Sequence, residues 1–199
     1  MPRLEEVVYY LRGLWLVLKG KPEGLGYLDL TEQGFWRSWW SLVYVLPPTL
    51  LSYLAVKTLV LSIHPDPGVI GVDFYFKLAA VDYGSTVITT VIFLVVARFG
   101  GFGQFAPAIV IALNWLAVPL QWAFSFENLI QIYVPGSALL TESTQFASML
   151  LTAFLSYRII DRIVGGSALV SATSLLTLYV VPQLSQYKIA QALALLPDL

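Results

Sequence analysis

The sequence predicts an all-α protein, a polytopic transmembrane helix bundle with about five spans and an N-terminal amphipathic interfacial helix. Three observations lead to this fold class. The chain of 199 residues is 58% hydrophobic and 12% charged, whereas soluble domains are about 25% charged. Long apolar segments recur, each near the roughly 20 residues that a helix needs to cross a bilayer. Residues 4–18 place apolar side chains at the spacing of one helical face.

Composition also limits the functions that the chain can have. The formal net charge is −1, so no overall positive charge attracts nucleic acid, and we expect no nucleic-acid partner. A single histidine, His64, and the absence of cysteine leave few of the ligands that metal, haem and iron–sulfur sites require. No nucleophile–base pair or nucleotide-binding motif is recognisable. We therefore expect no cofactor and no catalytic activity.

Residues 1–34 are expected to form a cytoplasmic amphipathic helix and a linker. The predicted apolar face of the helix consists of Leu4, Val7, Val8, Leu11, Leu14, Trp15 and Leu18. Such a face lies on the cytoplasmic membrane surface, or it packs on the protein's own spans or on another subunit. The stretch KGKPEGLGY then supplies the Gly and Pro residues of a loop, and Asp29 or Thr31 can cap a second helix.

Residues 35–185 form the predicted transmembrane domain, and residues 186–199 a short outward-facing tail. The spans are expected at five apolar segments: 38–62, 75–97, 102–125, 144–160 and 164–185. Residues 127–145 mix apolar and polar side chains around Pro135 and Gly136. We expect an interfacial loop there in preference to a re-entrant turn, because non-helical backbone inside a bilayer must be shielded by protein or water.

The distribution of basic residues predicts the orientation of the spans. With an internal N-terminus, the cytoplasmic segments hold Arg3, Arg12, Lys19, Lys21, Arg37, Arg98, Arg158 and Arg162. The opposite side and its helix ends hold Lys57, Lys77 and Lys188. Since the cytoplasmic loops of membrane proteins carry the excess of Lys and Arg, we expect the N-terminus in the cytoplasm and the C-terminus outside.

Asp82 is a carboxylate inside the second predicted span, and Lys57 lies near the outer end of the first. At a rise of about 1.5 Å per residue, both lie roughly 8–11 Å below the outer surface. An ion pair between them is the economical interpretation, because an unpaired charge at that depth costs a few kcal/mol. The alternatives are a proton or substrate role for Asp82 and a Lys57 side chain that extends outward to the headgroups.

Two amides in the third predicted span, Asn114 and Gln121, are seven residues apart and share one helical face. They could line a pathway or a cofactor, but we favour hydrogen bonds to neighbouring helices, which contribute about 0.6–2 kcal/mol each. In the first span, Pro47 and Pro48 lack backbone donors and free the carbonyls of Val43 and Tyr44. They predict a kink.

The stretches FAPAIVIALNWLAVPL and SYRIIDRIVGGSALVSATSLL resemble the last three spans of the Yip family of Rab-interacting membrane proteins and its bacterial relatives. The similarity extends over residues 35–185. It implies a role in membrane organisation or complex assembly, and a place in a bacterial cytoplasmic membrane. The stretch LDLTEQGFW does not match the acidic-Leu-Trp-Gly-Pro signature of the eukaryotic members, so Rab binding is not implied. No functional residue is carried over.

Two functions follow as hypotheses. The first is a non-catalytic scaffold, or an accessory or assembly subunit of a membrane complex, whose partners are the lipid bilayer and other membrane subunits or further copies of the chain. The second is a small oligomeric transporter or channel that uses Lys57, Asp82, Asn114 and Gln121. An enzyme that acts on lipids has the least support, since no nucleophile and base can be named.

Overall fold

The computed structural model describes residues 1–63, 70–134, 136–193 and 195 of the chain, and no strand occurs in these ranges. The prediction of an all-helical fold is therefore confirmed for the described residues. The elements are, in order, α1 (Leu4–Leu18), the 3₁₀ helix η1 (Pro22–Tyr27), α2 (Glu32–Ser38), α3 (Ser41–Tyr44), α4 (Leu46–Ile63), α5 (Val72–Phe99), α6 (Ala106–Tyr133), α7 (Ala138–Ile163) and α8 (Ala168–Ala192).

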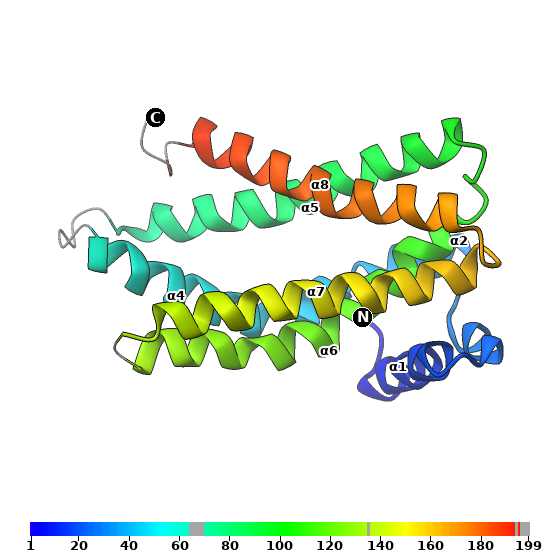
Figure 1. Ribbon diagram of the computed structural model, residues 1–199, viewed down its shortest axis with the longest axis horizontal. Helices are drawn as coiled ribbons and strands as arrows, with labels where there is room; N and C mark the ends of the chain where they lie inside the picture. Colours follow the sequence, from blue (N-terminus) through cyan, green and yellow to red (C-terminus); the bar gives the residue numbers. More distant parts are fainter. Residues whose placement is uncertain (64–69, 135, 194, 196–199) are drawn as a thin grey trace.

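The long helices form two layers that run along the length of the molecule (Figure 1). One layer is the antiparallel pair of α5 and α8, which pack against each other along much of their length. The other layer holds α4, α6 and α7, with α6 packed between its two neighbours. The N-terminal helix α1 lies beside the end of the bundle where α6 begins and α7 ends (Figure 1). The last turns of α8 lie at the opposite end.

Three helices, α5, α6 and α8, are long and apolar enough to cross a membrane. A fourth span results if the segment Glu32–Tyr44 and α4 are counted together, although they meet at a bend of 45°. The expected five spans are thus reduced to three, or at most four, within the described residues. The difference lies in α7, whose first turns carry Thr141, Glu142 and Gln145 and make it less apolar than its neighbours.

The predicted interfacial loop over residues 127–145 is wrong. Helix α6 continues to Tyr133 and α7 begins at Ala138, so most of this stretch is helical and neither a loop nor a re-entrant turn. The short connection includes Gly136, whose φ of 75° suits a residue without a Cβ. A hydrogen bond from Ser148 of α7 to the Glu127 carboxylate joins the two helices in this region, and this pairing replaces solvent as the partner of the polar groups.

The predicted tail over residues 186–199 also differs from the structure, because α8 continues to Ala192. Residues 194 and 196–199 lie outside the described residues, as does His64. At the other end of the chain, Thr31 is the cap of α2, as one of the two sequence alternatives predicts. Its Oγ1 accepts a hydrogen bond of 3.1 Å from the backbone N–H of Gly34.

The kink predicted at Pro47 and Pro48 is confirmed as a break between α3 and α4. Proline at position 48 has no N–H to donate to the carbonyl of Tyr44. That carbonyl instead accepts a hydrogen bond of 3.0 Å from the indole Nε1 of Trp122 on α6. A side chain from the neighbouring helix thus satisfies the backbone group that the proline leaves free.

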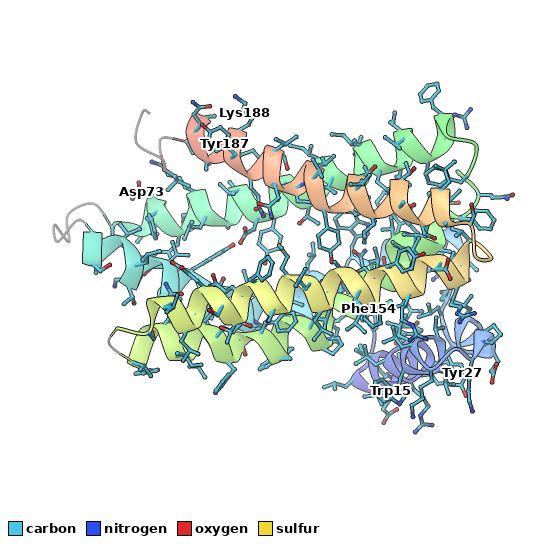
Figure 2. All side chains as sticks on the ribbon, in the orientation of Figure 1. Trp15, Tyr27, Asp73, Phe154, Tyr187 and Lys188 are labelled. Atoms are coloured by element: carbon cyan, nitrogen blue, oxygen red, sulfur yellow. The ribbon has the colours of Figure 1, made fainter. Side chains whose placement is uncertain are left out.

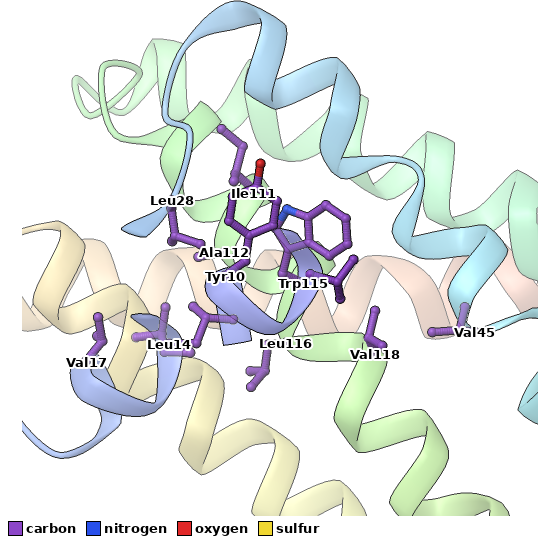
Figure 3. Close-up of a cluster of buried hydrophobic side chains, with 12 residues drawn as sticks. Tyr10, Leu14, Val17, Leu28, Val45, Ile111, Ala112, Trp115, Leu116 and Val118 are labelled. Carbon is purple, nitrogen blue, oxygen red and sulfur yellow. The ribbon is translucent and has the colours of Figure 1, made fainter. Parts of the chain in front are cut away.

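The first apolar cluster of the core lies where α1 meets α6 and α7 (Figure 3). Its centre is the indole of Trp115, which is 2% exposed and whose ring centroid lies 5.1 Å from that of Tyr10. Leu14 and Val17 of α1 are buried in the same cluster. The N-terminal helix is therefore part of the folded core.

Helix α1 also packs closely against η1, and two glycines allow this approach. A Cβ at Gly13 would clash with the Cβ of Tyr27 and would lie 2.7 Å from the carbonyl oxygen of Gly24. A Cβ at Gly24 would in turn lie 2.8 Å from the backbone nitrogen of Val17. The turn after α1 thus folds back onto the helix through backbone contacts that larger residues would prevent.

The variant Gly13→Ala is expected to destabilise the N-terminal unit by about 1–3 kcal/mol, the usual cost of overpacking. The clash outweighs the helix propensity of Ala, which favours it over Gly by about 1 kcal/mol. Thermal unfolding and limited proteolysis of residues 1–34 in detergent measure the effect. Gly26→Ala is the control, because a Cβ there meets nothing within 4 Å. Equal stabilities of the two variants would contradict the prediction.

Candidate functional site

The N-terminal helix is fixed to the bundle by polar contacts as well as by the apolar cluster. The guanidinium Nη2 of Arg37 lies 2.9 Å from both carboxylate oxygens of Glu6. The Tyr44 hydroxyl donates a hydrogen bond of 2.6 Å to the carbonyl of Pro2. These contacts join α1 to α2 and α3, so that the N-terminal segment and the broken helix hold each other in place.

The backbone N–H of Arg3 donates to the Glu6 carboxylate at 2.8 Å. This bond first, and then the Arg37 guanidinium, hold the pKa of Glu6 below its usual value. A lowered carboxyl pKa in the folded state means that the contact stabilises α1 at neutral pH and is lost as the pH falls through the folded-state pKa. The Glu6 carboxylate thus both accepts from the backbone N–H of Arg3, the N-cap residue of α1, and makes the ionic contact of the helix with the bundle.

The predicted apolar face of α1 is divided between two environments. Val7 and Leu14 are buried, and Leu11 and Leu18 pack against the same cluster. The remaining positions stay exposed: Leu4, Val8 and Trp15. The alternative that α1 packs on the protein's own helices is therefore confirmed for one side of the face. The placement of the helix on a membrane surface stays a prediction.

The exposed side of α1 forms a narrow apolar stripe. Trp15 is 58% exposed and lies on the side of α1 that faces away from the bundle (Figure 2). The ammonium group of Lys19 lies 4.8 Å from the centre of its ring. Leu4 and Val8 lie on the same helical face as Trp15, because the three positions are close to whole turns apart.

The predicted ion pair between Lys57 and Asp82 does not form. Within the described residues, the ion pairs are Arg37 with Glu6, at 2.9 Å, and Lys77 with Asp73, at 3.8 Å. Helix α4 packs mainly along α6 and α5 mainly along α8, so α4 and α5 meet at few positions. Where they meet, Asp82 lies beside Tyr53, about one turn before Lys57 on α4.

Asp82 instead faces Tyr53, which the sequence analysis did not identify. Tyr53 belongs to α4, is 4% exposed, and its hydroxyl makes no hydrogen bond with the residues that the structure describes. The carboxyl group of Asp82 is the titratable group beside that hydroxyl. A small movement of either side chain would join them. The pair connects the α5·α8 layer to the layer of α4, α6 and α7.

A second polar pair connects the same two layers. The hydroxyls of Ser156 on α7 and Tyr179 on α8 lie 3.5 Å apart. Where α5 ends and α6 begins, by contrast, the layers meet through a second apolar cluster that includes Phe93, Ile109 and Ile160. The contact between layers is thus apolar at the end that carries α1, whereas these two pairs along the helices are polar.

The two amides of α6 have different environments. The Nδ2 of Asn114 donates a hydrogen bond of 2.9 Å to the Oγ of Ser38, which is fully buried on α2. The hypothesis of a bond to a neighbouring helix is confirmed for this residue. Gln121 is exposed and makes no hydrogen bond with the described residues. Helix α2 covers α6 at Asn114 but ends at Ser38, so it does not reach the second amide.

A polar cleft of about 750 Å³ lies between α4, α6 and α7, around the turn that joins α6 to α7. Its polar lining includes Ser52, Thr58, Asn128, Gln131, Thr141 and Glu142. The sequence analysis missed it because its residues come from two separate stretches of sequence, 52–62 on α4 and 128–145 around the turn between α6 and α7. Thr141 is 5% exposed, and its hydroxyl has no hydrogen-bond partner in the part of the chain that the structure describes.

In the described ranges, no group of three or more His, Asp or Glu side chains could hold a metal ion. No protein-family model, curated protein or solved structure matches the chain. The resemblance to the Yip family therefore stays a prediction from the sequence.

A double-mutant cycle distinguishes the observed neighbour of Asp82 from the predicted one. We expect Asp82→Asn and Tyr53→Phe to be coupled by about 0.5–3 kcal/mol of unfolding free energy, as groups in contact are. Asp82→Asn and Lys57→Met should be additive within about 0.5 kcal/mol. Reversible unfolding in mixed detergent micelles measures both cycles. Strong coupling of Asp82 to Lys57, with none to Tyr53, would contradict the observed contact and support the ion pair instead.

Proposed function

We propose that this protein is a non-catalytic scaffold or accessory subunit of a membrane complex, with its N-terminus in the cytoplasm and its C-terminus outside. The observation that carries the proposal is the exposed amide of Gln121 on α6. An amide on the outer surface of a spanning helix needs a partner, and the described part of the chain does not supply one.

The position of Gln121 along α6 supports the inference that its exposed amide has a partner. Helix α6 has 28 residues and is about 42 Å long at 1.5 Å per residue. Gln121 lies near its middle, which places the amide well inside a hydrocarbon core of about 30 Å. Lipid offers no hydrogen bond to an amide, whereas a polar group on a second transmembrane helix does.

The surroundings of Gln121 support a helix as its partner. Trp122, the next residue along α6, is 53% exposed and offers apolar contact area next to the amide. Aromatic side chains of this kind are enriched at contact surfaces between proteins. We infer that a transmembrane helix of a second subunit covers this face of α6 and bonds to Gln121.

The exposed stripe of Leu4, Val8 and Trp15 supports the same function at the cytoplasmic end. Helix α1 is held rigidly by Arg37 and by the cluster around Trp115. Because α1 is fixed to the bundle, contact through its apolar stripe sets the orientation of the whole protein relative to the membrane or partner that the stripe contacts. The basic side chains of Arg12 and Lys19 on the same helix suit contact with lipid headgroups.

A cross-linking experiment tests whether Gln121 has a protein partner. Because the chain contains no cysteine, a maleimide reagent labels only the cysteine that is introduced. In the variant Gln121→Cys, labelled in native membranes with a benzophenone maleimide, we expect a protein adduct of defined mass. Val87→Cys on the exposed side of α5 is the control and should give lipid adducts. An adduct with a second copy of the chain would assign the complex as a homo-oligomer.

Lipid adducts alone at both positions would contradict the proposal. A companion measurement uses Gln121→Leu, which removes the amide but keeps an apolar surface. The complex isolated in mild detergent should dissociate at lower detergent concentration than the wild-type complex. The unfolding of the isolated chain should be unchanged, because Gln121 has no partner among the described residues.

A transporter or channel is the second candidate function, and the pair of Asp82 and Tyr53 between the two helix layers favours it. A titratable group inside a membrane protein often marks a proton or ion pathway. If this function holds, proteoliposomes with the wild-type protein should show proton or cation flux, and Asp82→Asn should lower that flux at least about tenfold. Lys57→Met is the matched control. Equal flux in empty liposomes and wild-type proteoliposomes would exclude it.

A further inference from the structure

The polar cleft between α4, α6 and α7 has a lining that is rich in hydrogen-bond acceptors. The hydroxyls of Ser52, Thr58 and Ser62 donate to backbone carbonyls of their own helix, at 2.6–3.0 Å. Each therefore turns its lone pairs, and not its proton, toward a ligand. These three residues give the α4 wall of the cleft an acceptor character.

The α7 wall adds a charge and an unpaired hydroxyl. Glu142 is exposed, lines the cleft and makes no ion pair within the described residues. Among the residues that line the cleft, no Lys, Arg or His balances its charge. Thr141 is buried, and its Oγ1 has no hydrogen-bond partner among the described residues, whereas buried hydroxyls ordinarily have one. A ligand in the cleft would supply that partner.

We propose that the polar cleft binds a primary ammonium group. Such a group offers three N–H donors and one positive charge, which match the acceptor lone pairs of the α4 wall and the Glu142 carboxylate. The cleft volume of about 750 Å³ lies within the range of small-molecule sites. Apolar residues such as Val56, Leu59 and Ile132 also line it, and they suit an aliphatic chain attached to the ammonium group.

Two sources can supply this chemistry, an ethanolamine phospholipid headgroup and a free organic amine. The position of the cleft admits both. It is lined by the last turns of α6 and the first turns of α7, where Gln131 and Thr141 lie. A helix of this length places its ends at the depth of the lipid headgroups. Gln121 does not line the cleft, and no step of this proposal uses it, so the site stands independently of the proposed function.

The lipid arm of the test compares two headgroups on the full-length protein. In nanodiscs that contain equal amounts of phosphatidylethanolamine and phosphatidylcholine, native mass spectrometry reports which lipid stays bound. Both headgroups carry a positive charge, but choline has no N–H donor. We expect selective retention of phosphatidylethanolamine. The soluble arm compares ethanolamine with choline by thermal shift and calorimetry in dodecylmaltoside, and a response to ethanolamine alone assigns the ligand as a free amine.

Three variants connect the binding to the cleft. Glu142→Gln should weaken binding in whichever arm is positive by at least about tenfold, because it removes a charge-assisted hydrogen bond. Thr141→Val should weaken it to a smaller extent. Ser143→Ala should change nothing, since Ser143 is exposed and bonds to the carbonyl of Leu139 on its own helix. Glu142 is itself exposed, so its replacement leaves the fold intact, which circular dichroism verifies.

The proposal is overturned by equal retention of the two lipids together with no response to ethanolamine. It is also overturned if Glu142→Gln binds as well as the wild-type protein. Retention of phosphatidylethanolamine that Glu142→Gln abolishes and Ser143→Ala preserves establishes the site.

Discussion

A bilayer offers no hydrogen-bond partners, and this constraint shapes most of the polar contacts between the long helices. The carbonyl of Tyr44, which Pro48 leaves free, is satisfied by the indole of Trp122. The amide of Asn114 reaches the buried hydroxyl of Ser38. Both donors lie on α6 and both acceptors lie on the broken helix, so one helix holds the irregular segment in place. Non-helical backbone within an apolar bundle is tolerated where neighbouring side chains complete its hydrogen bonds in this way.

The same constraint explains how the two layers meet. At the end that carries α1, fully buried apolar side chains such as Phe93 and Ile160 pack together. Away from that end, the contacts between layers include Asp82 beside Tyr53 and Ser156 beside Tyr179. Polar contacts hold only when their geometry is met, whereas apolar packing is non-directional. The α1 end of the bundle is therefore its fixed end, and the other end carries the polar cleft.

The fixed end is also where the N-terminal helix is built into the core. Tyr10 and Leu14 of α1 pack on Trp115, and Arg37 holds Glu6. Because of these contacts, α1 is part of the folded core and does not depend on lipid alone for its position. The exposed stripe of α1 and the exposed amide of Gln121 on α6 therefore belong to one folded unit. Their positions relative to each other are fixed. Such an arrangement suits a protein whose function is to position other components in a membrane.

Much of the fold follows from local sequence. Apolar length predicted α5 and α6, helical spacing predicted α1, Pro47 and Pro48 predicted the break, and Thr31 predicted the start of α2. Each is a property of one segment, which composition and spacing express directly. The extension of α6 to Tyr133 was missed, because mixed polarity near the end of a helix looks like a loop when the helix that covers it is unknown.

What the tertiary structure alone decided is which helices are neighbours. Asp82 and Lys57 are at similar predicted depth, but the side chain beside Asp82 is Tyr53, which lies about one turn before Lys57 on the same helix, α4. Asn114 and Gln121 lie on the same face of α6, yet α2 covers only Asn114. The polar cleft exists because the second half of α4 packs beside the turn between α6 and α7, which is distant from α4 in sequence. Sequence determines the chemistry and the periodicity of each helix, whereas the partner of each side chain depends on packing between helices, which no single segment encodes.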